Sequence, residues 1–377
     1  MSIMRTRRAI LGGVVAILGA GASQAAAQGC ILIRQSAPII GSMSSTYLRP
    51  GEWELDVSLR GSTADRHYSG DVYQAQRTAL GTNVVNKQRQ LIFNVDHAFT
   101  TRFSLGVTLP FVVASWSIPS PVAPVPGPRA TQHGDGFGDI SAMGRFWLFN
   151  TGTHATRNIS FGGGIKLPTG NADDTDTFVN ITGLSPSEKA VDQSVQPGDG
   201  GWGGQLEVQG FSKIGPLFAF GSGNYLINPR DMNGTPSILV GIGVPSAVVP
   251  LRNQNSVPDQ YVVRGGVGFP IWRGLGASMG VRVEGVPRYD LIGRSDGFRR
   301  PGEEVFFEPG VTYSHGKSTI QFNLPHGVYR NRAPDPYTGA AGDATFPDWV
   351  ALGTYSYRFG TVKHVAMPAP PPTTKQP

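Results

Sequence analysis

The sequence is poor in charge, in cysteine and in long hydrophobic runs. Charged residues make up 15% of the 377 residues, against about 25% in a typical soluble domain. A single cysteine excludes a disulfide framework and a metal site built from several thiolates. The mean hydropathy is -0.14, and no run of about 18 apolar residues follows the N-terminus, which excludes a bundle of transmembrane helices.

Glycine and proline are abundant instead, with 51 and 30 residues. Both disfavour helix interiors, so helix breakers are common in this chain and helix formers are scarce. The length alone would suit two average domains or one large β-structure. The composition therefore indicates a large, glycine-rich β-protein.

Residues 1–27 have the pattern of a secretory signal peptide. Arg5, Arg7 and Arg8 precede an apolar stretch at 10–20, and small residues at 25–27 form a cleavage site. Arg7 and Arg8 also resemble a twin-arginine export signal. Cys30 lies just past the cleavage site, as in a lipoprotein, although the leucine expected before it is absent. Removing the signal lowers the net charge from +6 to +3 (29 basic against 26 acidic residues), so we expect no nucleic-acid partner.

Apolar and polar residues alternate along much of the mature chain. In residues 53–60, Trp53, Leu55 and Val57 share one face of an extended strand, and Glu54 and Asp56 share the other. About twelve such segments occur, at residues 53–60, 90–96, 103–109, 139–148, 159–167, 205–209, 217–228, 261–269, 275–284, 305–313, 320–324 and 349–359. The series predicts an all-β fold of about twelve antiparallel strands.

The connections between these segments alternate in length. Short links fall near 99–101, 151–157, 213–216, 271–273 and 314–317. Long polar links fall near 61–85, 118–136, 169–198, 229–257, 290–302 and 331–346. A transmembrane β-barrel has short periplasmic turns and long outer loops, whereas a soluble sandwich has no reason to sort its loops in this way. We therefore expect an outer-membrane β-barrel over residues 51–360, with both chain ends in the periplasm.

In such a barrel the apolar face of each strand meets lipid, and the polar face lines the lumen. Small residues on the apolar face, such as Gly144, Gly163, Ala277 and Ala351, fit lipid better than a packed core. Aromatic residues at strand ends predict interfacial girdles; they are Trp53, Tyr261, Phe269, Tyr313, Trp349 and Phe359.

The predicted lumen-lining side chains carry both signs of charge. They are Glu54, Asp56, Arg60, Asp96, Asp139, Arg145, Lys166, Glu207, Arg264, Arg282, Glu284 and Glu308. Two interpretations stay open, namely a structural network of ion pairs and a selectivity filter. About twelve strands give a lumen between that of a filled eight-stranded barrel and that of an open sixteen-stranded porin.

Two segments flank the predicted barrel. Residues 28–50 form a periplasmic lead-in or, since 31–33 and 38–40 are apolar, a small plug. Residues 361–377 are rich in proline and are expected to form a disordered tail.

Four short motifs along the chain carry a family resemblance. They are PGEWEL at 50–55, GFGDI at 136–140, KLPTGN at 166–171 and GDGGW at 198–202. They resemble the outer-membrane family named for the MetA pathway of phenol degradation, which is related to the channels for long-chain fatty acids and aromatic hydrocarbons. The resemblance implies a barrel for passive passage of small, often hydrophobic or aromatic compounds. The chain departs from those channels in its smaller number of predicted strands and its tail after Phe359.

Signatures of catalysis and of metal binding are weak. The seven histidines show no metal-ligand spacing, and no G-x-S-x-G motif occurs. Ser314 and His315 are adjacent but fall in a predicted periplasmic turn. Asp173, Asp174 and Asp176 cluster in an outer loop and suggest either a weak divalent-cation site or, more simply, a solvated loop. We expect neither an enzyme nor a cofactor.

The sequence thus predicts an outer-membrane channel for passive uptake of small organic solutes, hydrophobic or aromatic ones among them. Its expected partners are the solute and the outer-membrane lipids, including lipopolysaccharide. Two alternatives remain, a non-conducting structural or adhesive surface barrel and a secreted soluble β-protein. The sequence does not determine the oligomeric state.

Overall fold

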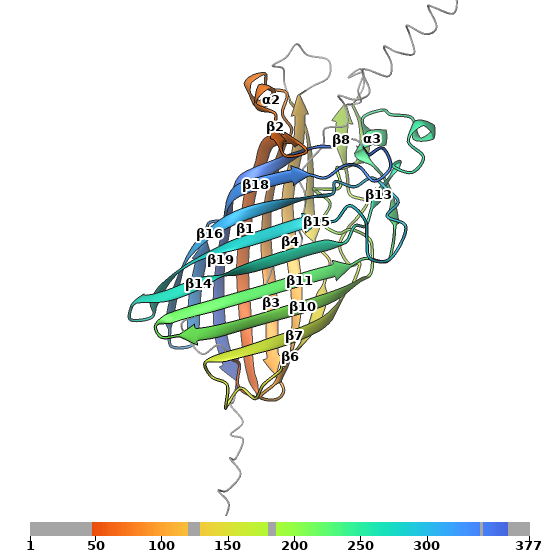
Figure 1. The fold of residues 1–377 in the computed structure, drawn as a ribbon. Coiled ribbons are helices and arrows are strands. Elements are labelled where there is room, and N and C mark those ends of the chain that lie inside the picture. The colour runs from red at the N-terminus through yellow and green to blue at the C-terminus, as the bar shows by residue number, and fades with distance from the viewer. Residues whose placement is uncertain (1–46, 120–128, 180–185, 340–341, 361–377) are drawn as a thin grey trace, which may run out of the picture.

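A computed structural model describes residues 47–119, 129–179, 186–339 and 342–360. These residues form a closed antiparallel β-barrel, with further short elements at one end (Figure 1). The predicted signal peptide (1–27), most of the predicted lead-in or plug (28–46) and the predicted tail (361–377) lie outside the described residues, so these assignments stay predictions.

The barrel has twelve strands, as the sequence predicts. Ten of them are single elements, namely β1 (Glu52–Ser69), β3 (Val85–Ala98), β4 (Phe103–Pro119), β7 (Arg157–Lys166), β10 (Gly203–Ile214), β11 (Leu217–Ile227), β14 (Gln260–Trp272), β15 (Leu275–Val286), β16 (Gly302–His315) and β19 (Asp343–Gly360). Pairing of β1 with β19, from Glu52 with Gly360 to Ser69 with Asp343, closes the wall.

The other two wall strands are each interrupted once. β5 (Arg129–Phe137) and β6 (Ser141–Trp147) both pair with β4, so they form one strand broken at residues 138–140. β17 (Ser318–Asn323) and β18 (His326–Arg332) both pair with β16 and are broken at residues 324–325. Pro325 lies in the second break, where its missing N–H removes no ladder hydrogen bond.

The short turns, the first residue of β1 and the last residue of β19 lie at one end of the molecule, which we call the periplasmic end. The opposite, outer end carries the long connections and the remaining elements (Figure 1). These are β2 (Val72–Tyr73), α2 (Ala75–Ala79), β8 (Thr175–Val179), β9 (Pro186–Ala190), β12 (Met232–Pro236), α3 (Ile238–Gly241), a 3-10 turn (Ser246–Val248) and β13 (Gln254–Ser256). Within the described residues, no helix combines the length and the apolar character needed to cross a bilayer.

Strand ends are where the sequence prediction was wrong. Residues 61–69 belong to β1 rather than to a loop, and residues 343–346 belong to β19. β4 and β5 likewise reach into the predicted link at 118–136. These strands project beyond the apolar band, and their outward residues, such as Thr63 and Ser115, are polar. Alternation between apolar and polar residues is lost there, which is why the sequence suggested loops.

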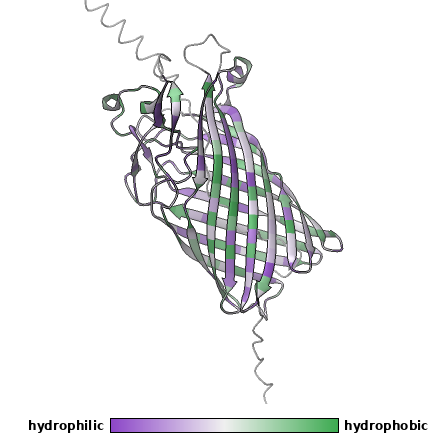
Figure 2. Cartoon of the chain, turned by 180° about the vertical axis from the view of Figure 1, so that it is seen from behind, coloured by the Kyte–Doolittle hydropathy of each residue, from purple (hydrophilic) through white to green (hydrophobic). Residues whose placement is uncertain are grey.

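Burial along the wall is reversed relative to that of a soluble protein. Leu59, Phe161 and Val263 are 62%, 52% and 50% exposed, whereas Glu308 and Arg282 are 2% and 3% exposed. Figure 2 shows the alternation of apolar and polar residues along the strands. Apolar side chains directed outwards and charged side chains directed inwards are the arrangement of a wall that faces lipid.

Apolar residues from the outer connections pack together at the outer mouth. We call this cluster, with the inward side chains of β4 that it contacts, the outer cap. Its buried members are Val84, Val112, Ala114, Trp116, Phe178, Val191, Val195, Ile238, Leu239, Ile242, Val249 and Phe298. The Asn86 and Gln88 side chains of β3 donate hydrogen bonds to Ser194 at 2.5 and 2.9 Å, so this part of the cap lies inside the mouth.

Candidate functional site inside the barrel

Ion pairs join strands that are not neighbours in the wall. Arg60 on β1 contacts Glu284 on β15 at 2.5 Å, although three wall strands separate them on the shorter way round. Arg264 on β14 contacts Glu308 on β16 at 2.5 Å, with β15 between them. Contacts of this kind can be made only through the interior of the barrel. The polar face of the strands therefore points inwards.

Arg145 is the centre of one such group. It contacts Asp96 on β3 at 2.8 Å and Glu207 on β10 at 2.7 Å. Asn94 lies beside Asp96 and donates a hydrogen bond of 3.1 Å to Asp56. One guanidinium thus links three wall strands that do not pair with one another.

The structure places all the predicted lumen-lining side chains on the inner side of the wall and gives each a polar partner. Glu54 pairs with Arg358, Asp139 with Lys166 at 3.2 Å, and Arg282 with Glu284 at 2.7 Å. The remaining members are those in the contacts already described. This arrangement is the structural ion-pair network that the sequence left open. Whether these side chains also select solutes stays a prediction.

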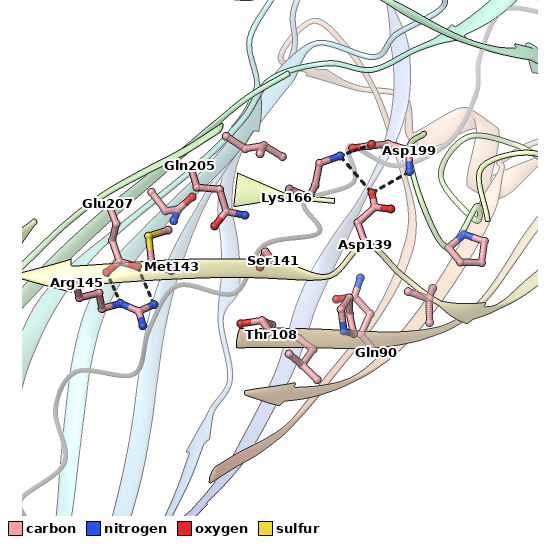
Figure 3. Close-up of a pocket in the computed structure, with 16 residues that line it drawn as sticks. Gln90, Thr108, Asp139, Ser141, Met143, Arg145, Lys166, Asp199, Gln205 and Glu207 are labelled. Carbon is pink, nitrogen blue, oxygen red and sulfur yellow. Dashed lines mark hydrogen bonds and ion pairs between the residues drawn. The ribbon is translucent and has the colours of Figure 1, made fainter. Parts of the chain in front are cut away.

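Three of the four family-like motifs meet at one point. Asp139 lies in the break between β5 and β6, Lys166 ends β7, and Asp199 precedes β10. The Lys166 ammonium lies between the two carboxylates, 3.2 Å from Asp139 and in a short contact with Asp199 (Figure 3). We call these three residues the Lys166 triad.

Glycines allow the three segments around the Lys166 triad to approach closely. A Cβ added to Gly198 would lie 2.4 Å from the carbonyl oxygen of Gly170, and one added to Gly170 would lie 2.8 Å from the carbonyl carbon of Gly138. The Gly170 N–H donates to Asp139 at 3.0 Å, and the Ile140 N–H donates to Thr169 at 2.9 Å. The glycines of these motifs are thus required by backbone contact.

An open-sided cavity with about 760 Å³ of empty space lies between the Lys166 triad and Arg145 (Figure 3). Its lining is of two kinds. Apolar side chains come from Ile92, Pro110, Val112, Met143, Pro197 and Leu226. Polar side chains come from Gln90, Thr108, Asp139, Ser141, Arg145, Lys166, Asp199, Gln205, Glu207 and Asn224. We call it the lumen pocket.

Several of these residues were not predicted as site residues from the sequence. Asp199 lies in a motif that we identified, between the predicted link at 169–198 and the next predicted strand. Gln90, Gln205 and Met143 lie on predicted strands, yet they carry no charge to single them out. Arg330, which contacts Glu304 at 3.1 Å, lies in β18, where no clear alternation predicts a strand. For the uncharged residues, the only sequence signal is the alternation of apolar and polar neighbours, which places them on the inward face of a strand.

The weak catalytic and metal candidates are not assembled into sites. Ser314 hydrogen-bonds Thr319 at 3.1 Å, whereas the adjacent His315 points to the opposite face of β16 and stacks on Tyr313. Asp176 accepts a hydrogen bond from the His133 N–H at 2.8 Å. In the ranges that the structure covers, no three His, Cys, Asp or Glu side chains converge on a possible metal position.

Comparisons with known proteins extend only to the fold. No family model matches the chain, and no curated protein matches its sequence. An outer-membrane channel from Pseudomonas putida F1 is similar in structure, with a TM-score of 0.57 and 14% identity over 86% of this chain and 100% of that one. Because the identity is low, this likeness shows the barrel fold alone, which is that of outer-membrane proteins.

Two further solved structures resemble the chain more loosely. A FadL homologue from Pseudomonas aeruginosa has a TM-score of 0.39 and 8% identity, over 82% of this chain and 90% of that one. The P. putida toluene transporter TodX has a TM-score of 0.38 and 9% identity, over 85% of this chain and 92% of that one.

Proposed function

We propose that this barrel is an outer-membrane channel through which small organic solutes pass without energy input. The lumen pocket is the observation that carries the proposal. A binding site for a small organic molecule is typically concave and largely apolar, with a few polar groups that orient the molecule. The lumen pocket is more polar than this, but it places an apolar part, formed by Ile92, Val112 and Leu226, beside the hydrogen-bonding amides of Gln90 and Gln205.

The charge arrangement disfavours anionic solutes. Lys166 faces two carboxylates and Arg145 faces two others, so carboxylates outnumber cations around the pocket. An excess of negative charge on a confined lining repels anions. We therefore infer that the solutes are not anionic and have an apolar or aromatic body with at least one hydrogen-bonding group. The family-like motifs around the Lys166 triad support an aromatic class.

One observation favours the alternative, a non-conducting structural or adhesive barrel. The outer cap places Ser194 against inward side chains of β3, and Val191 and Val195 have no exposed surface. A cap packed inside the mouth leaves less room for a solute. Conduction therefore has to be measured.

Swelling of proteoliposomes separates the two functions. Phenyl glucoside is a suitable aromatic probe because it does not cross the bilayer unaided, and glucose is the smaller non-aromatic control. We expect phenyl glucoside to enter at least as fast as glucose. No swelling with either sugar would establish the non-conducting barrel, and faster entry of glucose would contradict the aromatic class.

A matched pair of variants tests the role of the lumen pocket. Leu226 lines the pocket and is 1% exposed, whereas Leu206 on the neighbouring strand faces outwards and is 57% exposed. We expect Leu226→Ala to change the ratio of phenyl glucoside to glucose entry and Leu206→Ala to leave it unchanged. Equal ratios in both variants would mean that the pocket does not contact the solute.

A further inference from the structure

The outward face of the wall changes from apolar to basic at one level near the outer end. On β3 the outward residues run from His97 at the periplasmic end through Val95, Phe93 and Leu91 to Arg89 and Lys87. Arg89 pairs across the sheet with Gly61 of β1 and Val113 of β4, and Lys87 pairs with Thr63 and Ser115. At the next level beyond Arg89, the outward residues Thr63, Lys87 and Ser115 are polar.

The positions of Lys87 and Arg89 match the outer boundary of a membrane. His97 packs against Trp53 near the periplasmic end, with ring centroids 4.1 Å apart. Ten residues of strand, at about 3.4 Å each, separate His97 from Lys87, which gives about 34 Å along β3 and about 26 Å along the barrel axis for a strand tilt of about 40°. The apolar band of an outer-membrane barrel is about 25 Å tall. Lys87 thus lies at the level of the lipid head groups, and the long side chain of Arg89, one pleat below, reaches the same level.

The two cations are exposed and are not engaged by the protein. Within the ranges that the structure describes, neither Lys87 nor Arg89 has an ion pair or a side-chain hydrogen bond. The outward carboxylate in register with Arg89 is Asp135, which lies two strands away beyond Val113. Adjacent strands lie about 4.8 Å apart, so Asp135 is about 10 Å from Arg89 across the sheet.

We propose that Lys87 and Arg89 bind a phosphate group of lipopolysaccharide in the outer leaflet. Arg presents paired donors to phosphate oxygens, and Lys adds a second positive charge one pleat away. Val113, beside Arg89, and Leu59, one pleat below, are 48% and 62% exposed and offer an apolar surface to the acyl chains. A phosphorylated glycolipid fits this order of charge above apolar surface. The inference rests on the outer-membrane location in the proposed function and does not require conduction.

Binding of bisphosphorylated lipid A to purified protein in neutral detergent tests this inference. The test variant is Lys87→Ser with Arg89→Ser. The control variant is Arg157→Ser with Lys213→Ser, which removes two exposed cations at the periplasmic end. Each basic residue near an anionic lipid surface contributes roughly fivefold to binding, so we expect the test variant to bind about thirty-fold more weakly. The control variant should bind as the wild type does.

Three results would overturn the inference. The first is equal binding by the wild type and the test variant, and the second is an equal loss in the control variant, which would indicate a non-specific charge effect. The third is equally tight binding of phosphatidylglycerol by the wild type, which would indicate a general site for anionic lipids. Heat-modifiable gel migration checks that each variant is folded. Its absence in the wild type would refute the membrane barrel and this inference together, whereas absent liposome swelling would refute conduction alone.

Discussion

Arg145 shows how a single side chain stabilises a barrel from within. Its contact with Asp96 on β3 passes over β4, and its contact with Glu207 on β10 passes over β7. Removing one member of a buried ion pair leaves a desolvated charge and commonly costs about 3–5 kcal/mol. The inward charges of this barrel are therefore structural groups as well as candidate contacts for a solute.

Arg282 is the residue at which ion selectivity is best tested. Its side chain is 3% exposed and contacts Glu284 at 2.7 Å, whereas the preceding Val281 faces outwards and is 51% exposed. If the barrel conducts, Arg282→Ala should raise its cation-to-anion permeability ratio because a positive charge is lost from the interior. Reversal potentials in planar bilayers measure the ratio. Val281→Ala is the control, and an equal shift in both variants would contradict the inward placement of Arg282.

Gly198 is expected to be intolerant of any side chain. An added Cβ would lie 2.4 Å from the Gly170 carbonyl oxygen, whereas a Cβ on Gly163 would have nothing within 4 Å. Overpacking of this kind costs about 1–3 kcal/mol. We therefore expect Gly198→Ala to lower the free energy of unfolding by that amount and Gly163→Ala to leave it nearly unchanged. Urea titrations followed by tryptophan fluorescence give both values, and equal stabilities would show that the three segments do not touch.

At the scale of elements, the ends of β7 and β10 and the break between β5 and β6 are held together by the Lys166 triad. Lys166 and Asp199 are 6% and 5% exposed, so water screens their attraction little. The triad lies at the same place as the close contact between Gly170 and Gly198. The position of the lumen pocket thus depends on contacts made just beyond the residues where β7 pairs with β6 and with β10.

Loss of the central cation should therefore destabilise this region. Lys166→Met leaves the buried carboxylates of Asp139 and Asp199 close together without a cation between them. It should lower the free energy of unfolding by about 3–5 kcal/mol. Combining it with Asp139→Asn should recover part of the loss, because the repulsion between the two carboxylates is removed. Urea titrations of the single and double variants measure the effect. A double variant no more stable than Lys166→Met would mean that electrostatic repulsion is not the cause.

At the scale of the whole molecule, closure of β1 on β19 leaves no free edge in the wall and presents an apolar exterior. Such a surface suits lipid and would promote aggregation in water. We expect the chain to fractionate with the outer membrane and to migrate faster on gels before heating than after, because a closed barrel resists unfolding by detergent. Recovery in the soluble fraction with no heat-dependent shift would establish the remaining alternative, a secreted soluble β-protein.

The features of the fold that were predicted correctly are those encoded in short stretches of the sequence. Alternation around Leu55 and Asp56 identifies the two faces of a strand, because successive side chains point to opposite sides. The lengths of the connections identify the two ends of the barrel. The outer extension of β1 could not be predicted, because the alternation of apolar and polar residues ends at Gly61.

The candidate site was predictable only in part, for a related reason. Alternation places Arg60 and Glu284 on polar faces, but their contact joins residues 224 positions apart and exists only because the sheet closes. Pairing of β7 with β6 and with β10 brings Asp139, Lys166 and Asp199 together, and curvature of the sheet forms the lumen pocket. The sequence by itself therefore determined which side chains share a face, since strand geometry has a period of two. Only the tertiary structure decided which of those side chains meet, since curvature and closure are properties of the whole sheet.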